Sequence, residues 1–168
     1  MWKFEKYDVL LIGAVFLFVT SASAEVLKSI PLNGSETLIS KTYEFDKSVS
    51  SDGNGSVKIV ANAPTTIELL SVPLSNIEET KLLYSAKLKA MNLSAPAYLE
   101  MWLNFPGQGE FFSKGVQDPI NGTSEWVEKE IPFMLQKGQK PDRVKLNVVL
   151  QGTGTIWVDD IKLEKAPL

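Results

Sequence analysis

Apolar and polar residues alternate along most of the chain after residue 36. The alternation has a period of two, the period with which successive side chains of a β-strand point to opposite faces. Turns rich in glycine, such as Asp52–Gly55 and Pro106–Gly109, separate the alternating runs. The runs predict strands at Thr37–Phe45, Ser56–Ala61, Thr65–Val72, Thr80–Ala90, Ala97–Phe105, Glu110–Ser113, Trp126–Phe133, Val144–Leu150 and Thr155–Leu163. This spacing indicates an all-β, antiparallel sandwich or barrel of about eight or nine strands.

Three of these predicted strands have one face made only of apolar residues, which is expected to line the core. The apolar positions are Leu82, Tyr84, Ala86, Leu88 and Ala90 in the first, Ala97, Leu99, Met101, Leu103 and Phe105 in the second, and Val144, Leu146, Val148 and Leu150 in the third. The segment Glu25–Glu36 has no such face and is expected to form a short polar lead-in.

The last predicted strand changes parity in its middle. Ile156 and Val158 share one face, whereas Ile161 and Leu163 have the opposite parity. One extra residue at Asp159-Asp160 would bring all four apolar side chains back to the core. The pattern therefore predicts a β-bulge there, which would re-aim at least one of the two carboxylates.

Residues 1–24 have the pattern of a secretory signal peptide. A weakly basic start precedes the apolar run Val9–Val19, and Ala22 and Ala24 suit cleavage after Ala24. A transmembrane anchor is the alternative, but this run is short of the roughly 20 residues that span a bilayer. The chain is therefore predicted to be secreted or periplasmic, with no membrane insertion after cleavage and one domain over residues 25–168.

The composition excludes most catalytic chemistry. The chain has no histidine and no cysteine, which removes His-based nucleophilic triads and the usual zinc sites. Its net charge of −3 and single arginine provide no basic stripe for a nucleic acid. A pair of glycosidase carboxylates remains conceivable, with candidates at Glu100, Glu110, Glu125, Glu128 and Glu130. Solvated strand residues are the simpler interpretation, so the chain is expected not to be an enzyme.

The polar face of Ala97–Phe105 is unusual because it carries two aromatic residues. Tyr98 and Trp102 lie about 13 Å apart at roughly 3.3 Å per residue, with the carboxylate of Glu100 between them. Aromatic platforms beside carboxylate and amide groups suit both the apolar face and the hydroxyl fringe of a sugar. The predicted carbohydrate-binding residues are Tyr98, Glu100, Trp102, Asn104 and, if its strand is a neighbour, Asn147. The alternative is that the two aromatic side chains pack beneath the segment Pro106–Lys114.

Any bound metal would need oxygen ligands, which favours calcium. Asp159 and Asp160 at the predicted bulge are the best donors, with Glu44 or Asp46 as further candidates. We therefore expect one structural Ca²⁺ on Asp159, Asp160 and Glu44. The alternative is a buried carboxylate that accepts backbone N–H bonds at the bulge.

Three segments carry a resemblance to a known class of domain. They are GTSEWVEKEIPF at 122–133, VKLNVVLQGTGTIWVDDIKL at 144–163 and AYLEMWLNFPGQGEFFSKG at 97–115. These resemble galactose-binding-like jelly-roll domains, a fold that many carbohydrate-binding modules share, and a group of exported bacterial proteins of the same type. The resemblance implies a jelly-roll β-sandwich. It also implies a calcium ligand in the closing strand, at Asp159 or Asp160 and most plausibly Asp160.

Two hypotheses for the function follow. The first is an exported, non-catalytic binding module for a polysaccharide or other glycan. The second is a structural or protein-interaction domain that binds another protein of the cell envelope and has no glycan ligand. Both kinds of function occur on this fold, so the choice between them depends on the side chains of the binding face.

Overall fold

The structure is a computed structural model that describes residues 23–34, 38–39 and 43–168. All regular secondary structure in these residues is β. The strands are β1 (Glu25–Ile30), β2 (Glu44–Asp46), β3 (Ser56–Ala61), β4 (Thr65–Pro73), β5 (Thr80–Phe105), β6 (Gly109–Lys114), β7 (Ile120–Leu135), β8 (Arg143–Leu150) and β9 (Gly154–Ala166). The strands pair antiparallel in one curled sheet that forms a β-sandwich, as the sequence predicted.

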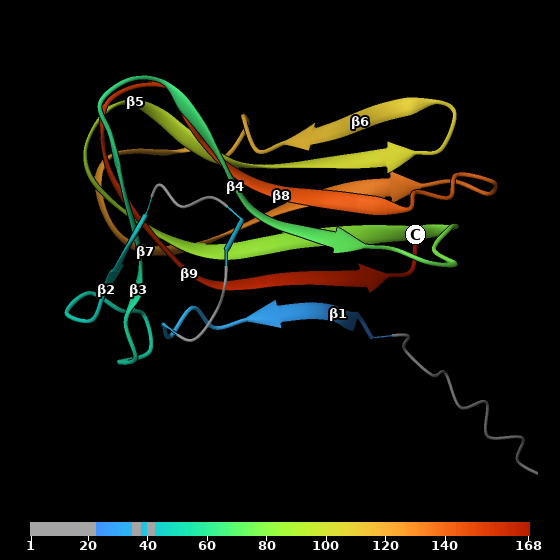
Figure 1. Cartoon of the computed structure of the whole chain (residues 1–168), viewed down its shortest axis with the longest axis horizontal. Coiled ribbons are helices and arrows are strands. Elements are labelled where there is room, and N and C mark those ends of the chain that lie inside the picture. Colours follow the sequence, from blue (N-terminus) through green and yellow to red (C-terminus); the bar gives the residue numbers. More distant parts are fainter. Residues whose placement is uncertain (1–22, 35–37, 40–42) are drawn as a thin grey trace, which may run out of the picture.

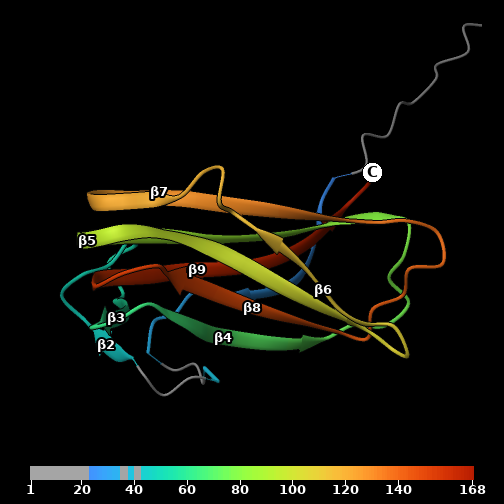
Figure 2. The same cartoon turned by 90° about the horizontal axis from the view of Figure 1, so that it is seen from above.

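The long strand β5 joins the two halves of the sandwich. Its first part, residues 80–91, lies between β7 and β9, and β9 pairs on its other edge with β1 and β3. Its last part, residues 97–105, lies between β6 and β8, and β8 pairs further with β4. We call these two parts the β9 half and the β8 half. In Figure 1, β5 curls at one end of the molecule and returns along its length, and Figure 2 shows β7 and β4 on opposite sides.

The two halves enclose one hydrophobic core. All fourteen apolar positions expected to line it, on β5 and β8, are buried. The closing strand contributes Ile156, Val158, Ile161 and Leu163 to the same cluster. These last four residues share the core because the predicted bulge is present. Residues Asp160 and Ile161 fall in the register shift opposite Ser85–Lys87, and Asp160 has a positive φ of 49°.

The turn before β9 docks against the bend in β5. The backbone N–H of Thr153 donates to Ser94 Oγ at 2.8 Å, and the N–H of Ser94 donates to the Thr153 carbonyl at 2.9 Å. A Cβ at Gly154 would come within 2.7 Å of the Asn92 carbonyl oxygen. Gly154 also has a φ of +137°, so both space and backbone conformation require glycine here.

Two sequence predictions differ from the structure near the amino terminus. Glu25–Ile30 is not a lead-in but a strand, because its backbone pairs with the edge of β9 from Glu25↔Lys165 to Ile30↔Ile161. The strand expected at Thr37–Phe45 is replaced by the short β2, and residues 37 and 40–42 lie outside the described part. The predicted signal peptide also lies outside it, except for Ser23 and Ala24. No helix in the described residues is long and apolar enough to cross a membrane.

Candidate functional site

The outer face of the β8 half carries the residues that the sequence singled out. Strand register places Tyr98 opposite Val149, Glu100 opposite Asn147, and Trp102 opposite Lys145. The expectation that Asn147 joins the same face is therefore confirmed. From the neighbouring strands, β4 brings Glu68 beside Asn147, while β6 brings Phe112 beside Trp102 and Lys114 beside Glu100. The result is a polar row across four strands, from Lys114 to Glu68, next to an aromatic pair.

This face is hollowed in two adjoining places. The first, which we call the central hollow, has a volume of about 460 Å³ and is lined by Thr66, Glu68, Glu100, Trp102, Glu110, Lys114, Lys145 and Asn147. The second, the Tyr98 hollow, has a volume of about 440 Å³ and is lined by Pro64, Thr65, Thr66, Tyr98, Val149, Leu150 and Gln151. The two hollows share Thr66, so together they follow the β5 face from Tyr98 to Trp102.

The segment Pro106–Lys114, which the sequence offered as a cover for the aromatic side chains, contains β6 and places Phe112 beside Trp102. Trp102 is half-buried there. Its ring lies 4.9 Å from that of Phe112, with the planes inclined at 48°. Phe112 itself is 54% exposed. The Lys114 ammonium lies 5.6 Å from the Trp102 ring and 4.7 Å from the Phe112 ring. The two rings therefore form an aromatic platform at the edge of the central hollow that a ligand can reach.

Glu100 is an ionised carboxylate held in a dry position. It is only 4% exposed. It accepts a hydrogen bond from Asn147 Nδ2 at 3.0 Å and forms an ion pair with Lys114 Nζ at 2.9 Å. Desolvation raises the pKa of Glu100, but hydrogen bonds from Lys114, Asn147 and Trp102 outweigh it and hold the pKa below 4.5. The bond to Glu100 in turn raises the pKa of Lys114. Both groups are thus charged at neutral pH.

Asn147 has a hydrogen-bond acceptor without a donor. The residue is 6% exposed, and while its Nδ2 is bonded to Glu100, its Oδ1 has no partner among the described residues. A buried acceptor without a donor costs about 1–3 kcal/mol. Because Asn147 lines the central hollow, a hydroxyl donor held there is placed to supply the missing bond.

Two of the predicted sugar-binding residues lie away from the central hollow. Tyr98 is buried to 7% exposure and lines the adjoining Tyr98 hollow. Asn104 lies near the end of β5, where its Nδ2 donates a hydrogen bond to Asp142 Oδ1 at 2.8 Å. The face therefore brings together Glu100, Trp102 and Asn147, with Tyr98 beside them and Asn104 at the margin.

Sequence reasoning missed the residues that β4 and β6 add to the hollow. Glu68 and Lys114 are ordinary polar positions on their own strands, and Phe112 lies in the segment Pro106–Lys114 that the sequence offered as a cover. Lys145 lies on β8, two residues before Asn147 and on the same face. Only the pairing partners reveal their role. The turn at Pro106–Gly109 would have given the register that sets Phe112 opposite Trp102, because hairpin turns fix strand pairing.

The bulge carboxylates are engaged by protein donors. Asp159 is fully buried; its Oδ2 accepts from the Ser51 N–H at 3.0 Å and its Oδ1 from the Asp160 N–H at 2.9 Å. Burial raises the pKa of Asp159 above 3.8, against these hydrogen bonds. Asp160 Oδ2 pairs with Lys87 Nζ at 2.7 Å, and that ammonium also donates to Ser51 Oγ at 3.3 Å.

These contacts fit a calcium ion poorly. Lys87 already supplies the positive charge, and Glu44, whose side chain is 76% exposed, faces Lys58 at 3.8 Å. No group of three or more potential metal-binding side chains of Asp, Glu, His or Cys occurs within the described ranges. The second interpretation in the sequence, a buried carboxylate that accepts backbone N–H bonds, describes Asp159. Calcium on Asp159, Asp160 and Glu44 stays a prediction from the sequence that these contacts do not favour, and chelation tests it.

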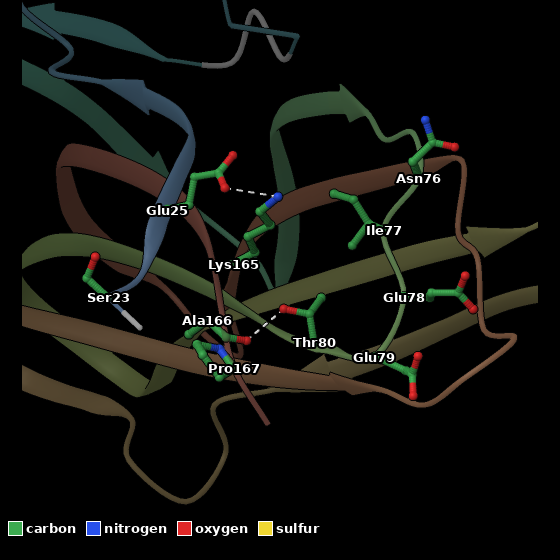
Figure 3. A pocket seen from close by; sticks show the side chains of 10 residues that line it. All are labelled: Ser23, Glu25, Asn76, Ile77, Glu78, Glu79, Thr80, Lys165, Ala166 and Pro167. Atoms are coloured by element: carbon green, nitrogen blue, oxygen red, sulfur yellow. Dashed lines mark hydrogen bonds and ion pairs between the residues drawn. The ribbon is translucent and has the colours of Figure 1, made fainter. Parts of the chain in front are cut away.

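A further hollow of about 400 Å³ lies where β1, β5 and β9 meet. Figure 3 shows Glu25 facing Lys165, which it contacts at 3.0 Å, and Thr80 pointing to the Ala166 carbonyl, to which it donates at 2.6 Å. On the far side of this hollow, the Glu78 carboxylate accepts a hydrogen bond from the Gly138 N–H and forms an ion pair with Lys140. No aromatic side chain lines this hollow. It therefore lacks the platform that distinguishes the β8 half.

Comparisons with known proteins agree on the fold. The sequence matches no protein-family model and no curated protein. Among solved structures, similarity extends to the CBM22-1–CBM22-2 tandem domain of Paenibacillus barcinonensis Xyn10C, with a TM-score of 0.63, 12% identity, and coverage of 89% of this chain and 47% of that one. A xylan-binding domain of CBM 22 gives a TM-score of 0.59, 9% identity, and coverage of 86% and 97%.

A third similar structure is a family 16 carbohydrate-binding module, with a TM-score of 0.54, 10% identity, and coverage of 73% of this chain and 84% of that one. At these identities the likeness concerns the arrangement of strands. That arrangement is the galactose-binding-like jelly-roll fold, which these carbohydrate-binding modules share.

Proposed function

We propose that this protein is a non-catalytic carbohydrate-binding module, and that a polysaccharide lies across the central and Tyr98 hollows. One observation carries the proposal. A half-exposed aromatic platform, Trp102 with Phe112, stands beside a buried amide oxygen, Asn147 Oδ1, that lacks a donor. The platform suits the apolar face of a sugar ring, and the oxygen suits one of its hydroxyl groups.

The similar structures support this proposal at the level of the fold. They are carbohydrate-binding modules, and two of them are described as xylan-binding. Carbohydrate binding is therefore the favoured use of this sandwich, and xylan is a first ligand to try. The identity of the glycan has to come from this chain's own side chains, because identities of 9–14% carry no residue correspondence.

The charge state of Glu100 makes this residue unsuited to be the general acid of a glycosidase. A glycosidase needs a carboxylic acid whose pKa is raised, so that it is protonated and can donate to the leaving oxygen. The pKa of Glu100 is lowered instead. The buried carboxylate whose pKa is raised, Asp159, belongs to the β9 half and is bonded to two backbone N–H groups.

Affinity electrophoresis tests the proposal directly. The purified protein is run through gels that contain xylan, β-1,4-galactan or a mixed-linkage β-glucan. We expect at least one neutral glycan to retard the protein, and Trp102→Ala to abolish the retardation. Unchanged mobility in every gel, with the protein shown to be folded, would overturn carbohydrate binding.

A second candidate function is protein interaction, for which β6 provides the observation. This edge strand pairs only with β5 among the described strands and carries two adjacent aromatic residues, Phe111 and Phe112, about half exposed. An envelope protein that docks on this edge would cover both rings. Crosslinking in the native envelope, followed by purification, would then recover one stoichiometric partner from the parent protein and none from Phe111→Ser.

We also infer that the protein is exported. The argument rests on the signal-peptide pattern of residues 1–24, and the first described strand begins at Glu25, directly after the predicted cleavage position. Intact-mass measurement of the protein purified from its native host tests this inference. A mass that corresponds to residues 25–168 would support cleavage after Ala24, and a full-length mass would contradict it.

A further inference from the structure

Both lysines that line the central hollow are already paired with carboxylates that line it too. Lys114 Nζ lies 2.9 Å from Glu100 Oε2, and Lys145 Nζ lies 2.8 Å from Glu110 Oε1. The hollow therefore offers an entering ligand no unpaired ammonium group. A third carboxylate, Glu68, also lines it and forms no ion pair within the described part of the chain.

The balance of charge in the hollows is slightly negative. Three carboxylates and two ammonium groups line the central hollow, so its formal charge is 2 − 3 = −1. The lining of the Tyr98 hollow contains no charged side chain. A polysaccharide laid across both would thus meet hydroxyl, amide and aromatic groups beside a net negative charge.

Among the residues that line the central hollow, an acidic sugar could gain a cation only by sharing or displacing a lysine that already pairs with a carboxylate. Glu100 has a side chain only 6% exposed, and removing one partner of a buried pair leaves an uncompensated charge with a large penalty. Displacing Lys145 costs less, because Glu110 is more exposed, but it leaves Glu110 and Glu68 to repel the incoming carboxylate. A neutral sugar breaks neither pair and can donate a hydroxyl to Asn147 Oδ1.

We infer that the two hollows select uncharged polysaccharides and reject acidic ones, and that Glu100 and Glu110 set this specificity by holding Lys114 and Lys145. This inference rests on the proposed carbohydrate binding. Glu100 and Glu110 act as specificity-determining residues, because their carboxylates neutralise the groups that would otherwise attract a uronate or a sulfate.

The test compares neutral and acidic glycans in affinity gels at low salt. The neutral ligands are xylan, β-1,4-galactan and β-glucan, and the acidic ones are polygalacturonate and alginate. We expect the parent protein to be retarded clearly by at least one neutral glycan and only weakly by either acidic one. Glu110→Gln frees Lys145 at a part-exposed position, so we expect it to fold normally and to bind polygalacturonate.

The expected gain for Glu110→Gln is about two- to fivefold over the parent protein, as for one part-exposed charge contact. It should vanish at high salt because the exposed charge is screened. Glu100→Gln frees Lys114 in the same way, and circular dichroism checks its fold. Glu125→Gln is the matched control, because that carboxylate pairs with Lys89 on the β9 half, and it should leave both neutral and acidic binding as in the parent.

The outcomes separate the inference from the proposed function. Retardation of the parent protein by polygalacturonate as strong as by a neutral glycan would overturn the charge selection and leave carbohydrate binding intact. A folded Glu110→Gln that gains no acidic binding would overturn the role of the ion pairs. A parent protein that no glycan retards would overturn the proposed function itself, and the inference with it.

Discussion

Replacing Trp102 by alanine separates a binding platform from a packing residue. In the structure, the indole is half-buried on the outer face and loses two kinds of contact when it is removed. The contact with the Phe112 ring, at 4.9 Å, is worth about 0.5–1.5 kcal/mol. The contact with the Lys114 ammonium, at 5.6 Å, is worth about 0.5–1 kcal/mol. The space opens into the central hollow, so water can enter and solvate Glu100.

The sum predicts that Trp102→Ala lowers the free energy of unfolding by about 1–2.5 kcal/mol. The neighbouring residue on the opposite face, Leu103, is fully buried, and its truncation to alanine should cost about 2–5 kcal/mol. Urea denaturation measures both, and affinity electrophoresis at a temperature where both variants are folded measures glycan binding. We expect Leu103→Ala to lose more stability but still to bind the glycan. We expect Trp102→Ala to lose less stability but to lose glycan binding.

Trp102→Phe is the conservative control, because it keeps an aromatic ring over the hollow and should retain most of the binding. The reasoning fails if Trp102→Ala destabilises the protein as much as Leu103→Ala does. Trp102 would then be part of the packing between β5 and β6. It also fails if Trp102→Ala remains folded and binds the glycan as tightly as the parent protein.

Three further predictions concern the rest of the fold. Chelation with EDTA should leave the melting temperature unchanged, because Lys87 and backbone N–H groups already hold Asp159 and Asp160; a fall of several degrees would establish a bound calcium. Tyr84→Phe should keep or raise the free energy of unfolding, by up to about 1–3 kcal/mol, because its buried hydroxyl has no described partner; a clear loss would reveal one. The unfolding free energies of Glu100→Gln and the parent, measured from pH 7 to pH 3, should converge on acidification. The folded pKa of Glu100 lies below 4.5, so its contribution is present above that pH and lost as the pH falls through the folded pKa; a constant difference would contradict this.

The core could be predicted from the sequence because its signal lies within single strands. Alternating positions on β5 and β8 identified the buried face, and the parity change between Val158 and Ile161 located the bulge. Both inferences need only the two-residue period of a strand and the rule that apolar side chains are buried. Neither depends on which strands are neighbours.

The parts that could not be predicted depend on pairing between distant segments. β1 is held by backbone hydrogen bonds to the edge of β9, and most of its side chains are exposed, so no apolar pattern marks it. The central hollow has the same origin. Lys114, Lys145 and Glu68 meet Glu100 and Asn147 only because β6, β8 and β4 assemble beside β5.

The two buried carboxylates support the proposed ligand site on the β8 half over one at the bulge. Asp159 is sealed by two backbone N–H groups of the protein, and desolvation raises its pKa, so any ligand would have to compete with the chain itself. Glu100 is held by the side chains of Lys114 and Asn147 at the wall of an open hollow. A sugar hydroxyl can donate to Asn147 Oδ1 without breaking these bonds, whereas a ligand of Asp159 would have to displace backbone N–H groups and disrupt the strand. The bulge therefore fixes the scaffold, and the row from Lys114 to Glu68 is the part of the sheet free to recognise something else.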